Sequence, residues 1–502
     1  MLRRHLTVLL LVVCAAIAAT SARSAPDRTA SGDHDPRLAR PLSLEDCVQI
    51  ALENNFDVRI SRLGSQAAQT DVGAEFGAFW PVFNLSVDRS DRVVFGEPTT
   101  PPGVQLLRNG TFGMVQKLPV GSTIGVDWVV GHDWLRPDPH DTPSQNIILS
   151  FVQPLLRGGG WRANTGGVTT ARYGARIADA GTRSRELAVT AETKSAYYEI
   201  IRNLKLIEVN QRAVGRDSQL VRQSQGKLDT GLGTKRDVLS ADIILAQDRG
   251  NLVDAVTAYH EALDGLTRVL GLQIGMHTIE IADRDVKLDS MPIEEARWIE
   301  KARRDSPVLE LAHLSVERSE VSKDVASNAR LPQFDVIASW DRFNNPDLNE
   351  AKKQENFFHA IAGDSLKTLN HTGNRGWTAG VVLSYPLGNK TLSNNYRRAQ
   401  LELEQVERAS ESAERQVVLE VRSAVRILRN NAERLIILQK NIAGARDKLE
   451  FASVNFQLGR ASNLDITDAQ KDLLVAETDY VNAVIDYRIQ IARIEQLIGG
   501  FE

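Results

Sequence analysis

The chain has 502 residues, which is enough for more than one ordinary domain. Lys and Arg number 60 against 64 Asp and Glu, and this near balance argues against nucleic acid as a partner, because a nucleic-acid surface carries a basic patch. Hydrophobic residues make up 42% of the chain while the mean hydropathy is −0.24. This composition allows a sizeable core and excludes a bundle of membrane-spanning helices.

The N-terminus is typical of a secretory signal peptide, which we place at residues 1–22. A basic start is followed by an apolar run from Leu6 to Ala19, too short to span a membrane, and Thr20-Ser21-Ala22 offers a cleavage site. Ala16-Ile17-Ala18 would also serve, so the exact cleavage site stays open. Residues 23–41 are rich in Pro, Ser, Asp and Arg and are predicted to be a flexible leader.

Residues 42–272 are predicted to form a first structural repeat, which opens with helices and continues with strands. The segment Ser43 to Asp46 resembles a capping box, and helical spacing runs from it until Pro81. Apolar and polar residues then alternate over 83–88, as in a strand with one apolar face. We read residues 89–110 as a loop. Further along, the patterns predict a hairpin over 111–118 and 122–130 and a strand over 147–153.

Two long helices complete this repeat, at about 163–228 and 235–270. Residues 273–291 are a predicted linker, and residues 292–500 repeat the order of elements. The junction Leu331-Pro332-Gln333-Phe334 matches Trp80-Pro81-Val82-Phe83. Strands are expected near 334–339 and 377–385, separated by a polar loop over 341–375. Long helices follow at about 393–457 and 463–498.

Both helical pairs end in the same kind of polar tip. Gly459 suits a left-handed helix cap, Ser462 or Asn463 can cap the next helix, and Asp465 lies in its first turn. Gly231 and Asp237 have the same spacing in the first repeat. The chain therefore contains a duplicated helical hairpin.

The helices carry apolar seams at coiled-coil spacing, rich in small residues that permit close packing. One seam is Val421, Val425, Leu428, Ala432, Leu435, Ile442 and Leu449. A helix of about 65 residues is roughly 100 Å long and needs such partners. On this feature alone a structural coiled-coil or spectrin-like rod is an equally good interpretation.

The strands favour a membrane protein over a rod. Alternation places one face toward lipid and the other toward a watery lumen, and aromatic residues could form interfacial girdles. The aromatic candidates are Trp80, Phe83, Phe151, Trp340, Trp377 and Tyr385. We expect two strands per repeat, four in all, which are too few to close a pore, so the chain must assemble with its own copies. A soluble β-sandwich split by helical insertions is the alternative, and the position of the extra hairpin stays open.

The duplicated order resembles the TolC-like outer-membrane factor family of bacterial efflux and type I secretion systems. The resemblance covers about residues 42–500 and includes Leu44-Glu45-Asp46 to Asn54-Asn55, the helix–Pro–strand junctions, Gln153-Pro154-Leu155 and both tips. It implies a mainly α-helical fold with membrane strands. It also implies a homotrimer, in which a coiled-coil α-barrel crosses the periplasm and continues into a shared 12-stranded β-barrel in the outer-membrane lipid of a Gram-negative-type bacterium.

The resemblance also implies partners and site residues. A periplasmic adaptor (membrane fusion) protein would dock at the tips, at Gly231, Leu232, Gly459 and Arg460, and an inner-membrane pump would supply the energy. Asp465 and Asp468 match two acidic positions that ring the closed periplasmic entrance, and Asp237 matches a partner in its lock.

Two departures from the family pattern concern this lock. The family's lock Arg is Ala461 here and its Tyr is Phe456, so neither bond of the usual lock can form. Without a gate role, Asp465 and Asp468 would serve only as helix caps and dipole compensation.

No enzyme and no cofactor are expected, because the chain shows no nucleophile–base arrangement, phosphate loop or metal-ligand spacing. His132-Asp133 and His140-Asp141 could suggest a metal site, but they fit a solvated loop better. The predicted function is an outer-membrane exit duct, and the alternative is a periplasmic coiled-coil scaffold without a barrel. Small-molecule efflux, metal efflux and protein secretion are all compatible with the sequence.

Overall fold

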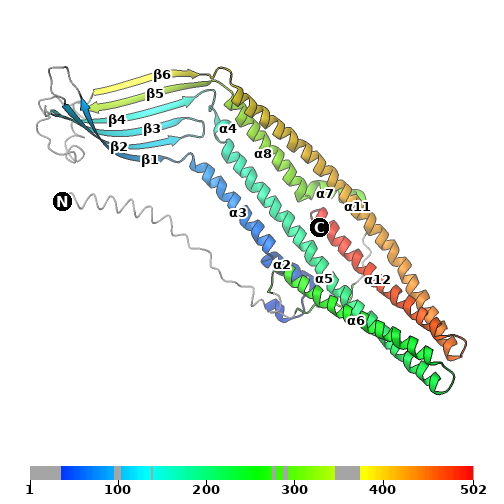
Figure 1. Cartoon of the computed structure of the whole chain (residues 1–502). Helices are drawn as coiled ribbons and strands as arrows, with labels where there is room; N and C mark the ends of the chain where they lie inside the picture. Colours follow the sequence, from blue (N-terminus) through cyan, green and yellow to red (C-terminus); the bar gives the residue numbers. More distant parts are fainter. Residues whose placement is uncertain are drawn as a thin grey trace.

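The computed structural model describes residues 36–94, 103–136, 140–273, 279–286, 292–344 and 374–500. The expected signal peptide, most of the leader and part of the linker lie outside these ranges. The described chain is elongated, with one β-sheet at one end and two helical hairpins reaching to the other (Figure 1).

All six described strands form a single antiparallel sheet in chain order. They are β1 (Val82–Val94), β2 (Gly103–Lys117), β3 (Thr123–Arg136), β4 (His140–Pro154), β5 (Gln333–Asn344) and β6 (Asn374–Ser384). Each strand pairs with the next, so the sheet is open and β1 and β6 are its two edges. Residues 82–154 contribute four of these strands and residues 333–384 contribute two.

The prediction of four strands in the sheet was therefore wrong, and so was the predicted loop at 89–94 and 103–110; residues 95–102 lie outside the described ranges. The loop expected at His132-Asp133 and His140-Asp141 was also wrong, because these residues lie in β3 and β4. The expected hairpin exists, but it forms β2 and β3 and lies inside the sheet between β1 and β4. Strand β1 continues to Val94, with Arg89 paired to Arg108. Charged residues made this stretch look like a loop, although backbone ladder bonds hold a strand whatever its side chains are.

The pairing register sorts the strand side chains onto two chemically different faces. One face, called here the apolar face, carries Phe83, Leu85, Phe112, Met114, Val126, Trp128, Leu149, Phe151, Val336, Trp340, Trp377, Val381 and Leu383. The other, called here the polar face, carries Asn84, Ser86, Thr111, Gly113, Gly125, Asp127, Ser150, Ser339, Thr378 and Gly380. The expected alternation is confirmed, and it extends through the inserted hairpin.

Shorter helices lie alongside the long hairpin helices or in the segments that lead into them (Figure 1). They are η1 (Pro36–Ala39), α2 (Leu44–Asn54), α3 (Phe56–Gly77), α4 (Trp161–Asn164), α7 (Glu295–Asp305) and α8 (Pro307–Ala329). The predicted capping box forms at the start of α2, between Ser43 and Asp46. Helix α3 packs on α5 (Gly166–Asp229) and α8 packs on α11 (Lys390–Gln457), so each shorter helix is paired with one long helix (Figure 1).

The long hairpins are α5 (Gly166–Asp229) with α6 (Lys235–Val269), and α11 (Lys390–Gln457) with α12 (Asn463–Leu497). The 68 residues of α11 correspond to roughly 100 Å. The predicted seam is confirmed, because Val421, Val425 and Leu428 are fully buried. None of the helices in the described ranges is long and apolar enough to span a membrane.

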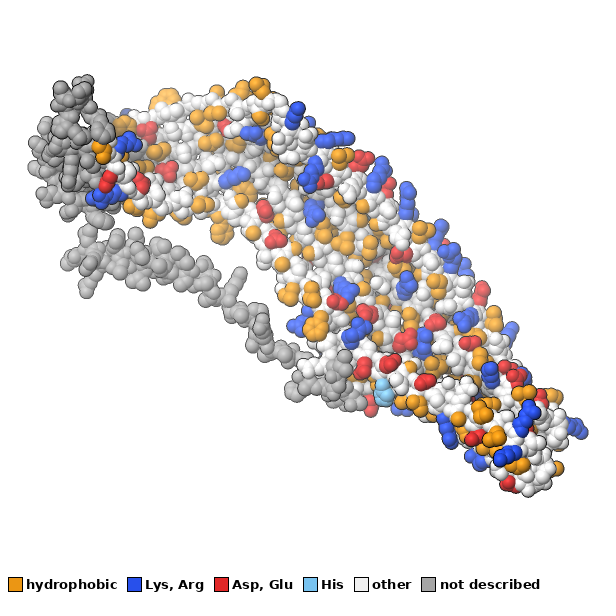
Figure 2. Space-filling view, viewed as in Figure 1, with side chains coloured by type: hydrophobic (Ala, Val, Ile, Leu, Met, Phe, Trp, Pro, Cys, Tyr) orange, Lys and Arg blue, Asp and Glu red, His pale blue; other side chains and the backbone are white. Residues whose placement is uncertain are grey.

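The core follows the hairpins in three clusters. One joins α2 to α5, with Cys47, Ile50 and Tyr197 at its centre. The second joins α7, α11 and α12 around Trp298 and Leu428. The third lies near the tips and includes Phe456 and Ile466. Burial within the chain is therefore concentrated in the helices, whereas many apolar strand residues are exposed (Figure 2).

Candidate functional site

The two hairpin tips are built in the same way. Gly459 has φ 72° and Gly231 has φ 76°, the left-handed conformation that glycine adopts without strain. Ser462 then caps α12 in a capping box with Asp465, and Thr234 caps α6 in a capping box with Asp237. Of the two predicted caps of α12, Ser462 is therefore the one used.

The caps hold two of the predicted gate carboxylates in their ionised form. Hydrogen bonds from the Ser462 backbone and hydroxyl lower the pKa of Asp465, and those from the Thr234 hydroxyl and backbone lower the pKa of Asp237. Capping is therefore a structural role that both residues fill, independently of any role in transport.

Asp468 lies one turn further into α12 and has a different partner. Its carboxylate accepts a 3.2 Å bond from Lys448 Nζ on α11, which also donates to Asp472 at 2.5 Å. These hydrogen bonds, first from Asp472 and then from Asp468, raise the pKa of Lys448. Asp237, Asp465 and Asp468 are thus each held by a different partner. Within the described ranges, no group of three His, Cys, Asp or Glu side chains is placed to hold a metal ion.

Asn463 connects the two tips inside one chain. Its side chain is only 6% exposed, and its Nδ2 donates to the backbone oxygen of Asp237 at 2.8 Å. Its Oδ1 accepts a 3.0 Å bond from the Ser224 hydroxyl on α5. The sequence suggested Asn463 only as a possible cap, because nothing in local spacing indicates a partner in the other hairpin.

Lys227 makes the second connection between the tips. Its Nζ donates to the Phe456 carbonyl at 2.7 Å and lies 3.2 Å from the centre of the Phe456 ring. Burial lowers the pKa of Lys227, opposed by the charge of Asp237. Phe456 cannot donate a phenol hydrogen bond, yet this ring and carbonyl still join the hairpins. Sequence reasoning missed Lys227 because a cation–π contact between distant helices leaves no local pattern.

The outermost tip residues are free of contacts that would bury them. Leu232 is 82% exposed, and Gly231, Gly459 and Arg460 are exposed as well. Leu464 and Leu458 are also exposed, so each tip presents apolar side chains beside its glycine turn. Such apolar groups on two short turns are available for contact with another protein.

A buried polar cluster lies further up the hairpins and was not predicted. Asp217 on α5 is 2% exposed and faces Asp248 on α6. Burial, followed by the hydrogen bond that protonated Asp217 donates to the Asp248 carboxylate, raises the pKa of Asp217 to about 7. Glu477 on α12 lies 3.6 Å from Arg212 and 3.5 Å from Arg446, which joins three helices. No local sequence pattern predicts this cluster, because its members lie on four different helices.

Comparison with known proteins agrees with this architecture. The model of the outer membrane efflux protein family matches residues 47–272 and 298–500. Outer membrane protein TolC of Vibrio cholerae is 24% identical over 384 residues, covering 74% of this chain and 81% of that protein.

Solved structures of outer-membrane channels share the fold. The outer-membrane channel OprN has a TM-score of 0.69 at 16% identity, covering 95% of this chain and 96% of OprN. CmeC of Campylobacter jejuni has a TM-score of 0.67 at 14% identity, covering 91% and 86%. The open state of MtrE of Neisseria gonorrhoeae has a TM-score of 0.65 at 15% identity, covering 91% and 89%. Since the family model matches more than half of the chain, the chain belongs to the outer membrane efflux protein family.

Proposed function

We propose that three copies of this chain form one duct, which receives substrates from an inner-membrane pump and a periplasmic adaptor protein. The observation that carries the proposal is an open sheet with an apolar face and two unpaired edges, joined to hairpins roughly 100 Å long. The sheet suits the outer membrane, and the hairpins suit the periplasm. In this proposal residues 42–272 and 292–500 are the two repeats, and residues 273–291 link them.

The sheet edges support self-assembly. Unpaired backbone groups are strongly unfavourable in hydrocarbon, so β1 of one copy must pair with β6 of the next. Three six-stranded sheets give eighteen strands rather than the twelve that the family resemblance implied. The cross-section of the membrane pore would then exceed that of a twelve-stranded barrel, because barrel diameter grows with strand number.

Strand stagger is compatible with closure. The paired residues can be followed across the sheet, strand by strand, from Val82 at the start of β1. They lead to Thr378 on β6, which lies six residues before Ser384, the end of that strand. We place the ends of β1 and β6 that adjoin the helices at one depth in the membrane. The offset of six residues along the strands, across five spacings between strands, then corresponds to a strand tilt of about 40° from the barrel axis. Membrane barrels have tilts of about 35–45°.

The hairpin tips are the proposed periplasmic entrance. Threefold symmetry would bring copies of Asp465 and Asp468 together, with Asp237 nearby, so the opening would attract cations. The contacts of Asn463 and Lys227 would hold the two hairpins of each copy together in the closed state, in place of the family's Arg and Tyr lock. The adaptor would dock at Gly231, Leu232, Gly459 and Arg460.

Outer-membrane fractionation followed by single-channel recording in planar bilayers tests this function. A duct fractionates with the outer membrane and conducts, whereas a periplasmic scaffold is extracted without detergent and gives no channels. For the entrance, Asp465→Asn/Asp468→Asn should reduce cation preference and block by trivalent cations added on the periplasmic side. Salt should weaken this block in the natural protein. Unchanged selectivity and block would show that these carboxylates only cap the helix.

A further inference from the structure

Two pairs of arginines face each other across neighbouring strands on the apolar face. Arg89 on β1 is paired with Arg108 on β2, and Arg342 on β5 is paired with Arg375 on β6. The next pair on this face toward the helices is Trp340 with Trp377. Aromatic residues of this kind mark the membrane interface in strand proteins, so Arg342 and Arg375 lie just beyond the apolar band.

These pairs are unfavourable without a further partner. Like charges directly opposite each other on antiparallel strands repel. Arg89 has Asp91 at 3.2 Å on its own strand. Within the described ranges Arg108, Arg342 and Arg375 form no ion pair or side-chain hydrogen bond, and Arg108 and Arg375 are exposed. Arg108, Arg342 and Arg375 therefore keep hydrogen-bond donors and positive charge for a ligand, whereas Arg89 donates from Nε and Nη2 to Asp91 and has only its remaining donor groups available.

Strand tilt brings the two pairs to a common depth. The position of each pair can be compared on β4 by following the paired residues across the sheet. Arg89 and Arg108 lead to Pro143, and Arg342 and Arg375 lead to Ile147, which is four residues closer to the helices. Because the strands are tilted, positions at one membrane depth shift along successive strands toward the helices. At a tilt of about 40°, this shift is about five residues over four strands. The observed offset is within about one residue of that drift, so the pairs lie at one level of the sheet.

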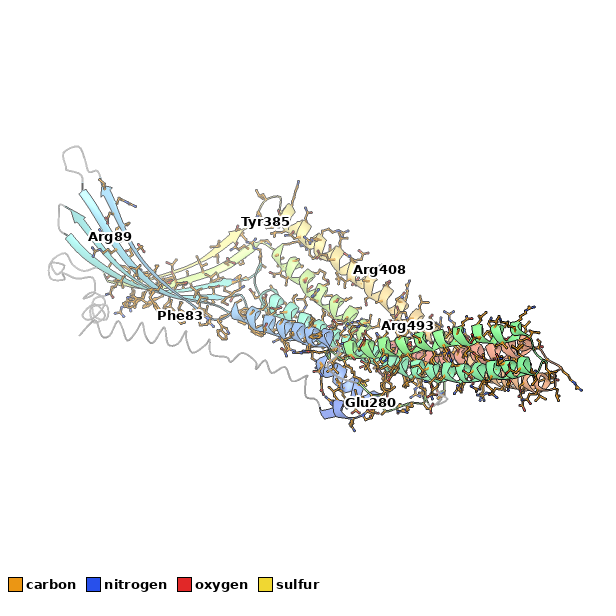
Figure 3. The ribbon with its side chains drawn as sticks, turned by 60° about the horizontal axis from the view of Figure 1, so that its bottom comes forward. Phe83, Arg89, Glu280, Tyr385, Arg408 and Arg493 are labelled. Atoms are coloured by element: carbon orange, nitrogen blue, oxygen red, sulfur yellow. The ribbon has the colours of Figure 1, made fainter. Side chains whose placement is uncertain are left out.

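This level is at the outer side of the membrane. Figure 3 shows Phe83 near the helical end of β1 and Arg89 further toward the opposite end. Because the helices are periplasmic in the proposed function, on which this inference rests, the arginines lie beside the outer leaflet. On that face the nearby medium is lipid headgroups.

We propose that the pairs Arg89–Arg108 and Arg342–Arg375 bind the phosphate groups of outer-leaflet lipids. A guanidinium presents a planar fork of donors that matches phosphate oxygens, and two facing forks can bind one phosphate from both sides. The phosphate removes the repulsion within each pair. Bound lipid would thereby fix the depth of the sheet in the membrane.

Native mass spectrometry of the detergent-solubilised trimer tests the proposal, with diphosphorylated lipid A as the probe. Arg342→Gln/Arg375→Gln and Arg89→Gln/Arg108→Gln should each weaken lipid A retention at least about tenfold, since each removes charged hydrogen bonds. The matched control is Arg92→Gln/Lys117→Gln, which removes the same charge from the polar face of the same sheet. It should retain lipid A as the natural protein does.

Two further probes identify the ligand. Dephosphorylated lipid A should bind all variants equally weakly, and inorganic phosphate alone should compete only at high concentration if the lipid is the source of the phosphate. Equal retention of lipid A by all variants, or an equal loss in the control pair, would overturn the proposal. A protein that forms no trimer and does not enter membranes would instead contradict the proposed function.

Discussion

The sheet and the helical hairpins place their apolar residues in opposite ways. In the hairpins, apolar side chains at coiled-coil spacing point inward, and Leu428 is fully buried in the chain. In the sheet, alternate apolar side chains point outward, and Leu383 and Trp377 are 72% and 78% exposed. Both regions have regular backbone hydrogen bonding, so the difference lies only in where the apolar groups find a non-aqueous environment.

The comparison shows that one chain is built for two solvents. In water, the hydrophobic effect stabilises the hairpins by burying their apolar side chains. The hydrophobic effect does not stabilise packing between side chains that lipid already surrounds. In the proposed duct, the sheet then depends on its ladder bonds and on pairing of its edges with other copies. Substitutions in the two regions should therefore have different effects and different readouts.

The largest effect is expected for truncation in the helical core. Leu428→Ala should lower the free energy of unfolding by about 2–5 kcal/mol, because it leaves a cavity among well-packed side chains. Leu383→Ala removes the same atoms from the apolar face, where lipid can fill the space, and should cost much less. Chemical denaturation of both variants in detergent gives the comparison. Equal costs would mean that the sheet is packed like the helical core.

A charge should separate the two faces of the sheet. Val381→Arg places a charge on the apolar face near the middle of the band and should cost about 2–4 kcal/mol of membrane assembly. Thr378→Arg lies on the polar face of the same strand and should assemble nearly normally. The yield of folded trimer in outer-membrane fractions is the measurement. A similar loss in both variants would contradict the assignment of the faces.

The connection between the tips should be weaker than the core but specific. Asn463→Ala leaves the Asp237 carbonyl and the Ser224 hydroxyl without this partner and should cost about 1–3 kcal/mol. The closed entrance should lose stability, so open probability in planar bilayers should rise. Asn430→Ala, at an exposed position on α11, is the control and should leave gating unchanged. Unchanged gating in Asn463→Ala would remove this residue from the closed-state contacts.

A pH dependence of stability is also expected in the helical region, where the pKa of Asp217 is raised. Burial raises the pKa of Asp217 from 3.8 to about 7, so the folded chain holds this proton more tightly than the unfolded chain. The resulting stability is fully present below pH 3.8 and is lost as the pH rises through about 7. Tm measured between pH 4 and pH 8 should therefore fall toward pH 8, and Asp217→Asn should flatten that part of the profile. An unaltered profile would assign the dependence to other groups.

Local patterns were sufficient to predict most of the fold. The helix bounds, the alternating strands and the tips with Gly459 and Asp465 all follow from spacing and capping preferences along short segments. Residues 89–94 and 103–110 were misread as a loop, because their charged side chains lie beyond the apolar band on strands that still pair. The polarity of the side chains indicates whether a strand end is surrounded by water or lipid. It does not indicate where the backbone hydrogen bonds between the strands end.

The candidate site was predictable only in part. Asp465 and Asp237 were found because a cap has a fixed local spacing, whereas Lys448, Lys227 and the second role of Asn463 depend on helices far apart in the chain. Such contacts are set by how α5, α6, α11 and α12 pack, and no short segment encodes them. Facing arginines such as Arg342 and Arg375 became visible only once the strand register was known.

The account's central claim is that three open sheets close into one wall in the outer membrane. The most direct test is single-particle cryo-electron microscopy of the full-length protein in lipid nanodiscs. The account predicts three copies with eighteen strands, in which β1 of one copy pairs with β6 of the next and the hairpin β2–β3 lies in the wall. A monomer, or a twelve-stranded barrel in which β1 pairs with β4 and the hairpin lies outside the wall, would contradict it.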